Sequence, residues 1–112
     1  MALYHYKLGF PDVVLPTDPL QLVYGNHARH AASGDRYGTI KLPESVHIHT
    51  CQIIEMEVYY PRVVKLLLRL PYDEINDLCI VVLLKGNFVK TVWLNRKTDW
   101  HQTLDKGKYQ LP

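Results

Sequence analysis

The residues of this chain that are best suited to chemistry are its six histidines and the cations around them. His27 and His30 are three residues apart, which makes them neighbours on one face of a helix. That spacing could hold a zinc ion, but no HExxH motif and no Cys/His partner set accompany it. A hydrogen-bonded or solvated pair is therefore the alternative. His47 and His49 would share one face of a local strand, as sheet-edge histidines.

Several common chemistries lack their motifs. The chain has no glycine-rich phosphate loop and no GxSxG element around a nucleophilic serine. Glu55 and Glu57 share one strand face, but a glycosidase or a two-metal nuclease needs further converging carboxylates. The acids of the segment PYDEIND resemble a solvated turn instead. A metal-dependent nuclease is therefore not favoured.

Cleavage of RNA without a metal makes smaller demands, and this sequence supplies them. A base must take the proton from a 2′-hydroxyl, an acid must protonate the leaving oxygen, and cations must stabilise the charge on phosphorus. Aromatic side chains can stack on unpaired bases. The candidate residues are His27, His30, Arg36, Lys65, Arg69, Thr91, Trp93, His101 and Tyr109.

The clearest structural signal runs from residue 52 to residue 95. Four segments rich in Val, Ile, Leu and aromatic residues follow one another, QIIEMEVYY, RVVKLLLRL, LCIVVLL and FVKTVWLN. Pro61, the segment PYDEIND and Lys85-Gly86-Asn87 separate them, which leaves no room for crossover helices. The spacing predicts a four-stranded antiparallel meander with one apolar face and one polar face, the latter carrying Glu55, Glu57, Lys65, Arg69, Thr91 and Asn95.

The apolar face of the predicted sheet must be covered by residues 1–50. Residues 1–19 contain Pro11, Pro16 and Pro19 and predict an arm that packs on the domain, with a short strand before the prolines. Residues 20–50 predict a helical region, in which LQLVYG could form a short strand. Its best helix is 27–33, between Asn26 as N-cap and Gly34 as the stop. Residues 96–112 form a polar C-terminal tail.

The whole chain of 112 residues is the size of one domain. The sequence predicts an α+β fold, with short N-terminal helices packed on the four-stranded antiparallel β-meander. Lys and Arg exceed Asp and Glu by only two, which excludes a histone-like basic binder but not a local basic site. Cys51 and Cys79 are expected to be reduced thiols of a cytoplasmic protein, and no apolar run is long enough to span a membrane.

Four stretches carry a family resemblance: NHARHAASGDRYG, IIEMEV, VVKLLLRLPYD and VKTVWLNRKTDWHQTLDKGKY. Together they resemble a small phage and bacterial family related to the toxin ribonucleases of the RelE/EndoU/colicin-type superfamily. The resemblance implies helices packed on a four-stranded antiparallel sheet and RNA cleavage without a cofactor or metal. It implies His101 or His30 as acid and base, with Thr91 and Tyr109 in the catalytic set and Arg69 as a phosphate clamp. Lys65, His27, Arg36 and Trp93 would bind substrate.

Two functions of different classes follow. The first is a metal-independent endoribonuclease, whose partners would be RNA and an antitoxin or immunity protein. The second is a non-enzymatic phage-type protein that binds a host factor with the same scaffold. The enzyme predicts histidine and arginine side chains converging on an open sheet face. The binding protein predicts an exposed apolar patch instead.

Overall fold

A computed structural model describes residues 2–99 of the chain. In this part the protein has eight strands, one α-helix and three 3-10 helices, so it is mainly β. The prediction of an α+β fold, with helices on a four-stranded meander, is therefore wrong. The error lies in residues 20–50, which form mostly short strands and extended chain in place of helices.

The central four strands occur where the alternation predicted them. They are β5 (Gln52–Tyr59), β6 (Arg62–Pro71), β7 (Asn76–Leu83) and β8 (Phe88–Arg96), each antiparallel to the next. Gly86, with φ of 76°, and Asn87, with φ of 53°, make the turn between β7 and β8. Positive φ is the reason that glycine suits this turn. The prediction of an antiparallel meander over this segment is confirmed.

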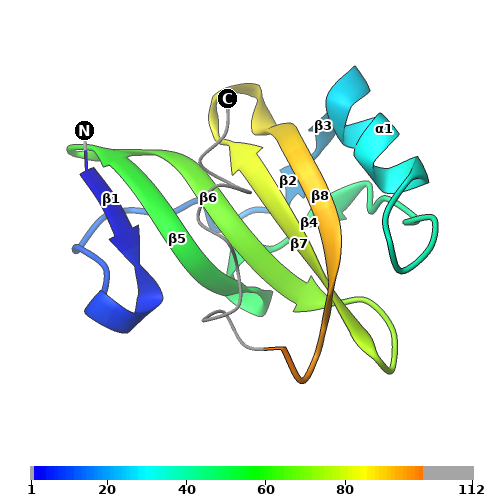
Figure 1. Cartoon of the computed structure of the whole chain (residues 1–112). Coiled ribbons are helices and arrows are strands. Elements are labelled where there is room, and N and C mark those ends of the chain that lie inside the picture. The colour runs from blue at the N-terminus through cyan, green and yellow to red at the C-terminus, as the bar shows by residue number, and fades with distance from the viewer. Residues whose placement is uncertain (1, 100–112) are drawn as a thin grey trace.

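Two further strands complete a six-stranded mixed sheet in the order β1-β5-β6-β7-β8-β3 (Figure 1). At one edge β1 (Ala2–His5) is antiparallel to β5. At the other edge β3 (Val23–Tyr24) is parallel to the start of β8. β1 lies where a short strand was expected before the prolines, and β3 lies in the segment LQLVYG, which could form a short strand. Their pairing depends on partners far away in the chain, which local patterns do not reveal.

The predicted helix is present as α1 (Asn26–Ser33), but its start differs in detail. Gly25 is the N-cap, and no side chain caps the first turn, so Asn26 is not the cap. The rest of residues 20–50 contains a two-stranded sheet of β2 (Leu20–Gln21) and β4 (Ser45–Val46). The 3-10 helices are η1 (Tyr6–Leu8), η2 (Ile48–Thr50) and η3 (Lys85–Asn87).

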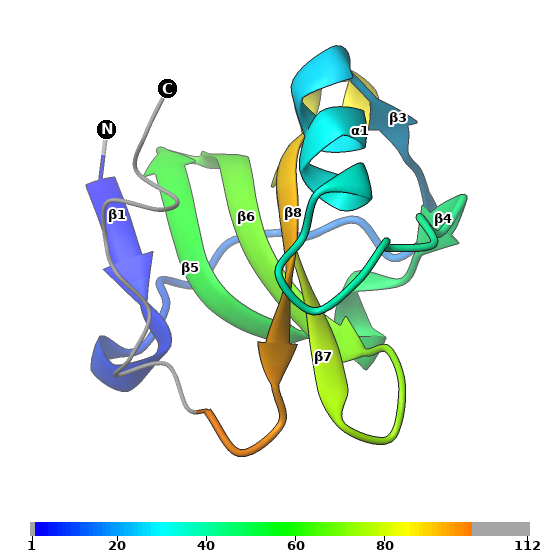
Figure 2. The ribbon, with the colours of Figure 1, turned by 45° about the vertical axis from the view of Figure 1, so that its right-hand side comes forward.

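The main core covers one face of the sheet. Ala28 and Ala32 of α1 pack there with Val92 and Leu94 of β8. The N-terminal arm packs on the same core through Phe10, Val13 and Leu15, which are partly buried there. Figure 2 shows α1 beside β8 and the arm crossing behind the sheet. Phe10, Val13 and Leu15 therefore lie on the main-core face, whereas Tyr6, from the start of the arm, packs on the opposite face.

That second face is less polar than predicted. Ile54, Leu67, Cys79 and Val81 form a second buried apolar cluster on it, with Tyr6 and Trp93 packed against them. Three of the polar residues predicted for this face, Glu55, Arg69 and Asn95, are buried. The face is therefore not an open polar surface at these positions. Cys51 and Cys79 are free thiols, and no helix among residues 2–99 is long and apolar enough to cross a membrane.

Because of Tyr24, the stability of the fold is expected to depend on pH in the alkaline range. Its hydroxyl donates to the carbonyl oxygen of Pro43, and burial raises the pKa of Tyr24 to about 12, against a smaller lowering effect of Arg29. Because the folded-state pKa exceeds the ordinary value of 10, this contribution to stability is complete below pH 10 and is lost as the pH rises towards 12. In urea unfolding, we expect Tyr24→Phe to lose less stability over this range than the wild-type protein. Equal losses in both proteins would contradict this account.

Candidate functional site

A groove along the outer edge of β8 gathers three of the predicted site residues. Arg36, Thr91 and Trp93 line it, together with Ala31, Gly34, Asp35, Val92 and Leu94. We call it the β8 groove. Its volume is about 420 Å³, within the usual range of ligand sites. The groove exists because β3 pairs with β8 only at Phe88 and Val89, and α1 lies beside the remainder of the strand.

Asp35 fixes the position of the turn that carries Arg36. One carboxylate oxygen of Asp35 accepts a hydrogen bond from the backbone N–H of Leu94 at 3.1 Å. The other accepts from the backbone N–H of Tyr37 at 3.0 Å. One side chain therefore joins the turn after α1 to the edge of β8. It also satisfies an edge N–H group that another strand could otherwise pair with.

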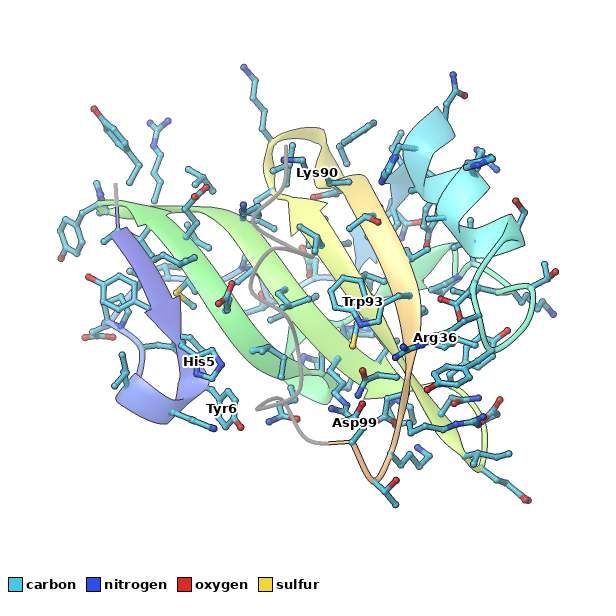
Figure 3. All side chains as sticks on the ribbon, in the orientation of Figure 1. His5, Tyr6, Arg36, Lys90, Trp93 and Asp99 are labelled. Carbon is cyan, nitrogen blue, oxygen red and sulfur yellow. The ribbon has the colours of Figure 1, made fainter. Side chains whose placement is uncertain are left out.

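Two guanidinium groups share one aromatic ring at this turn. The Arg36 guanidinium carbon lies 4.7 Å from the centre of the Tyr37 ring, and that of Arg96 lies 4.0 Å from it. Both distances fit cation–π contacts. Arg36 is exposed, and Figure 3 shows its side chain reaching toward the strand that carries Trp93. The arrangement offers cationic groups, a hydroxyl group and an indole ring along one edge.

The two helix histidines differ in their relation to the groove. Residues four apart lie on the same helix face, so His27 shares the face of Ala31, which lines the groove one turn further on. The buried residues of α1 are Ala28 and Ala32, and His30 lies on the opposite, solvent side of the helix. His27 and His30 are both exposed. Neither histidine is among the lining residues, and each stands one helical turn before one of them, His27 before Ala31 and His30 before Gly34.

Arg69 does not serve as an open phosphate clamp. Its Nε donates to Asp77 Oδ2 at 2.7 Å, and its two terminal nitrogens donate to the carbonyl oxygens of Arg96 and Asp99 at 2.9 and 3.0 Å. Only 4% of the Arg69 side chain is exposed. Burial opposes ionisation of Asp77, but hydrogen bonds from Lys97 and Arg69 outweigh it and lower the pKa of Asp77. The guanidinium instead joins β6, β7 and the end of β8.

The other predicted residues are not brought to the β8 groove. Lys65 lies 3.9 Å from Glu57 on the neighbouring strand, on the second face of the sheet. His101 and Tyr109 lie outside the described residues, so the structure does not place them. His47 and His49 are exposed at η2, with ring centres 5.2 Å apart. Within residues 2–99 no cluster of three or more His, Cys, Asp or Glu side chains could hold a metal ion.

Sequence reasoning missed the groups that build the groove. Asp35, Tyr37 and Arg96 carry no motif, and their roles arise from contacts between the turn after α1 and the last strand. The available signal was local: Asp35 followed by Arg36 and Tyr37 predicted a turn, but not the strand on which the turn rests.

Comparison with known proteins adds no relative to this picture. No protein-family model matches the chain, and neither a curated protein nor a solved structure matches it.

Proposed function

We propose that the protein is a metal-independent endoribonuclease that binds unpaired RNA in the β8 groove. The observation that carries the proposal is the convergence of Arg36, Thr91 and Trp93 in one groove. A guanidinium binds phosphate with paired hydrogen bonds, and an indole ring stacks on a base only when that base is unpaired. The resemblance to toxin ribonucleases supports the same class of reaction.

The proposed reaction is transphosphorylation within the RNA backbone. A base removes the proton of a 2′-hydroxyl, and that oxygen attacks the adjacent phosphorus. The bond from phosphorus to the 5′-oxygen of the next nucleotide breaks, and an acid protonates this oxygen. The products are a 2′,3′-cyclic phosphate and a free 5′-hydroxyl. Arg36 would stabilise the charge on the phosphoryl oxygens, and His27 would be one of the proton-transfer groups.

The test is incubation of purified protein with total tRNA and mRNA in the presence of EDTA. We expect the wild-type protein to produce fragments with 2′,3′-cyclic phosphate ends. Arg36→Ala should weaken RNA binding by about tenfold and reduce the salt slope by about one, since one phosphate contact is lost. Arg62→Ala is the matched control, because Arg62 is an exposed cation outside the groove. RNA that remains intact and unbound would overturn the proposal.

The second predicted class, a non-enzymatic binding protein, also has support in the structure. It predicts an exposed apolar patch, and Val14, Tyr59 and Tyr60 are large apolar residues with exposed fractions of 92%, 63% and 75%. Binding of a host factor at such a patch would not require His27 or Arg36. Substitution of these two residues therefore separates the two functions.

A further inference from the structure

A second groove lies at the end of the sheet where the β5–β6 and β7–β8 hairpins turn. Val63, Val64 and Leu84 line it from the sheet, and Val14 and Pro16 line it from the N-terminal arm. The backbone N–H of Leu84 donates to the carbonyl oxygen of Val64 at 3.1 Å, so these two residues are direct neighbours. The groove has a volume of about 680 Å³. We call it the hairpin groove.

The charged residues that line the hairpin groove are all positive. Its remaining lining residues are Pro61, Arg62 and Lys85, and no carboxylate is among the lining residues. Arg62 and Lys85 are both exposed, and they stand just beyond the hydrogen bond that joins Val64 and Leu84. The surface therefore suits an apolar side chain that has a carboxylate directly beside it.

The loop between β6 and β7 presents such a pair. Ile75 is 61% exposed, and Glu74 beside it is also exposed. The carboxylate of Asp73 accepts hydrogen bonds from the backbone N–H groups of Ile75 at 2.8 Å and Asn76 at 2.6 Å. These bonds hold the loop in one conformation. Glu74 and Ile75 are thus exposed on a turn of fixed conformation. The loop therefore loses little conformational entropy when it binds a partner.

We propose that the Glu74–Ile75 loop of one molecule docks into the hairpin groove of a second copy. The loop cannot reach its own groove, because β6 runs from Arg62 at the groove to Pro71 at the loop. Its ten residues span about 30 Å. Figure 1 shows this loop and the two hairpin turns at opposite ends of the sheet.

The contact is head-to-tail, since the two surfaces differ. A contact of this type links each molecule to two others, and it builds a ring or an open row according to the rotation between neighbours. The surfaces are small compared with a stable interface, and the association is weak and reversible. Opposite charges meet in it, so salt weakens it.

Sedimentation velocity of the purified full chain over a range of concentrations tests the proposal. We expect the weight-average sedimentation coefficient to rise with protein concentration and to fall back when salt is added. Glu74→Arg should abolish the rise, and so should the double variant Arg62→Glu/Lys85→Glu, because like charges then meet. An equimolar mixture of the two variants should associate again, because each groove then meets a loop of opposite charge. Ile75→Ser keeps the charges and should weaken association through the lost apolar contact.

Two results would overturn the proposal. One is a sedimentation coefficient that does not change with concentration. The other is association that persists in both charge variants, which would assign it to another surface. All substituted residues are exposed, and far-ultraviolet circular dichroism checks that the variants fold. None of them lines the β8 groove, so their RNA cleavage should match that of the wild-type protein. Failure of self-association therefore leaves the proposed function separately testable.

Discussion

Arg69→Ala is expected to lower the free energy of unfolding by about 3–5 kcal/mol. The substitution removes the hydrogen bonds of Arg69 to Asp77 and to the carbonyl oxygens of Arg96 and Asp99, and it leaves Asp77 without its buried partner. An acceptor left without its donor in a buried site costs more than the bond contributes while it is intact. Urea unfolding followed by circular dichroism measures the loss.

Lys97→Ala is the control for this substitution. Lys97 also contacts Asp77, at 2.7 Å, but its side chain is 37% exposed. An ion pair of this exposure contributes about 1 kcal/mol or less, so the variant should remain close to the wild-type protein. If Arg69→Ala lost RNA cleavage while its stability stayed within about 1 kcal/mol of the wild-type value, Arg69 would regain the catalytic role that the resemblance implied.

The second large effect concerns catalysis. We expect His27→Ala to reduce RNA cleavage by about 10²–10⁴-fold, which is the usual contribution of one general acid or base. Binding of RNA in the β8 groove should persist, because Arg36 and Trp93 are retained. Single-turnover cleavage kinetics and an RNA-binding titration, both in EDTA, separate the two effects.

His30→Ala is the matched control, since it removes a histidine from the same helix on its solvent side. It should leave cleavage unchanged. Both histidines are exposed, so neither substitution should unfold the protein. Equal losses in the two variants, or no loss in His27→Ala, would remove His27 from the proton-transfer role.

Local sequence patterns predicted the four central strands and the helix, whose formation depends on residues that are close together in the sequence. The four strands from Gln52 to Arg96 alternate in polarity or are wholly apolar, and prolines, glycine and acidic turns end them at the observed places. The helix ending at Ser33 follows from its alanines and the glycine after it. Short strands were expected near Ala2–His5 and Val23–Tyr24, but their partners in the sheet did not follow, because each pairs with a strand far away in the chain.

For the candidate site, too, the sequence gives the residue types but not which residues meet in the fold. Residue type singled out Arg36, Thr91 and Trp93 as candidates, but it could not show that all three line one groove at the edge of β8. That meeting depends on the hydrogen bond between Asp35 and Leu94, which are 59 residues apart. Arg69 fits a phosphate clamp equally well by type. Only the surrounding carbonyl groups and Asp77 reveal that its donors are engaged within the fold.

The mixed sheet has a consequence for the order in which the protein is assembled during synthesis. Its two outer strands, β1 and β3, leave the ribosome early, but each pairs with a strand made much later, β5 or β8. Each of the four inner strands pairs with the strand next to it in the sequence. Contacts between residues that are close together in the sequence form fastest. The meander therefore contains the pairings expected to form fastest, and the border at β3 closes only after β8 has been made. The β8 groove, which depends on the turn after α1 reaching the last strand, is complete only when β8 has been made.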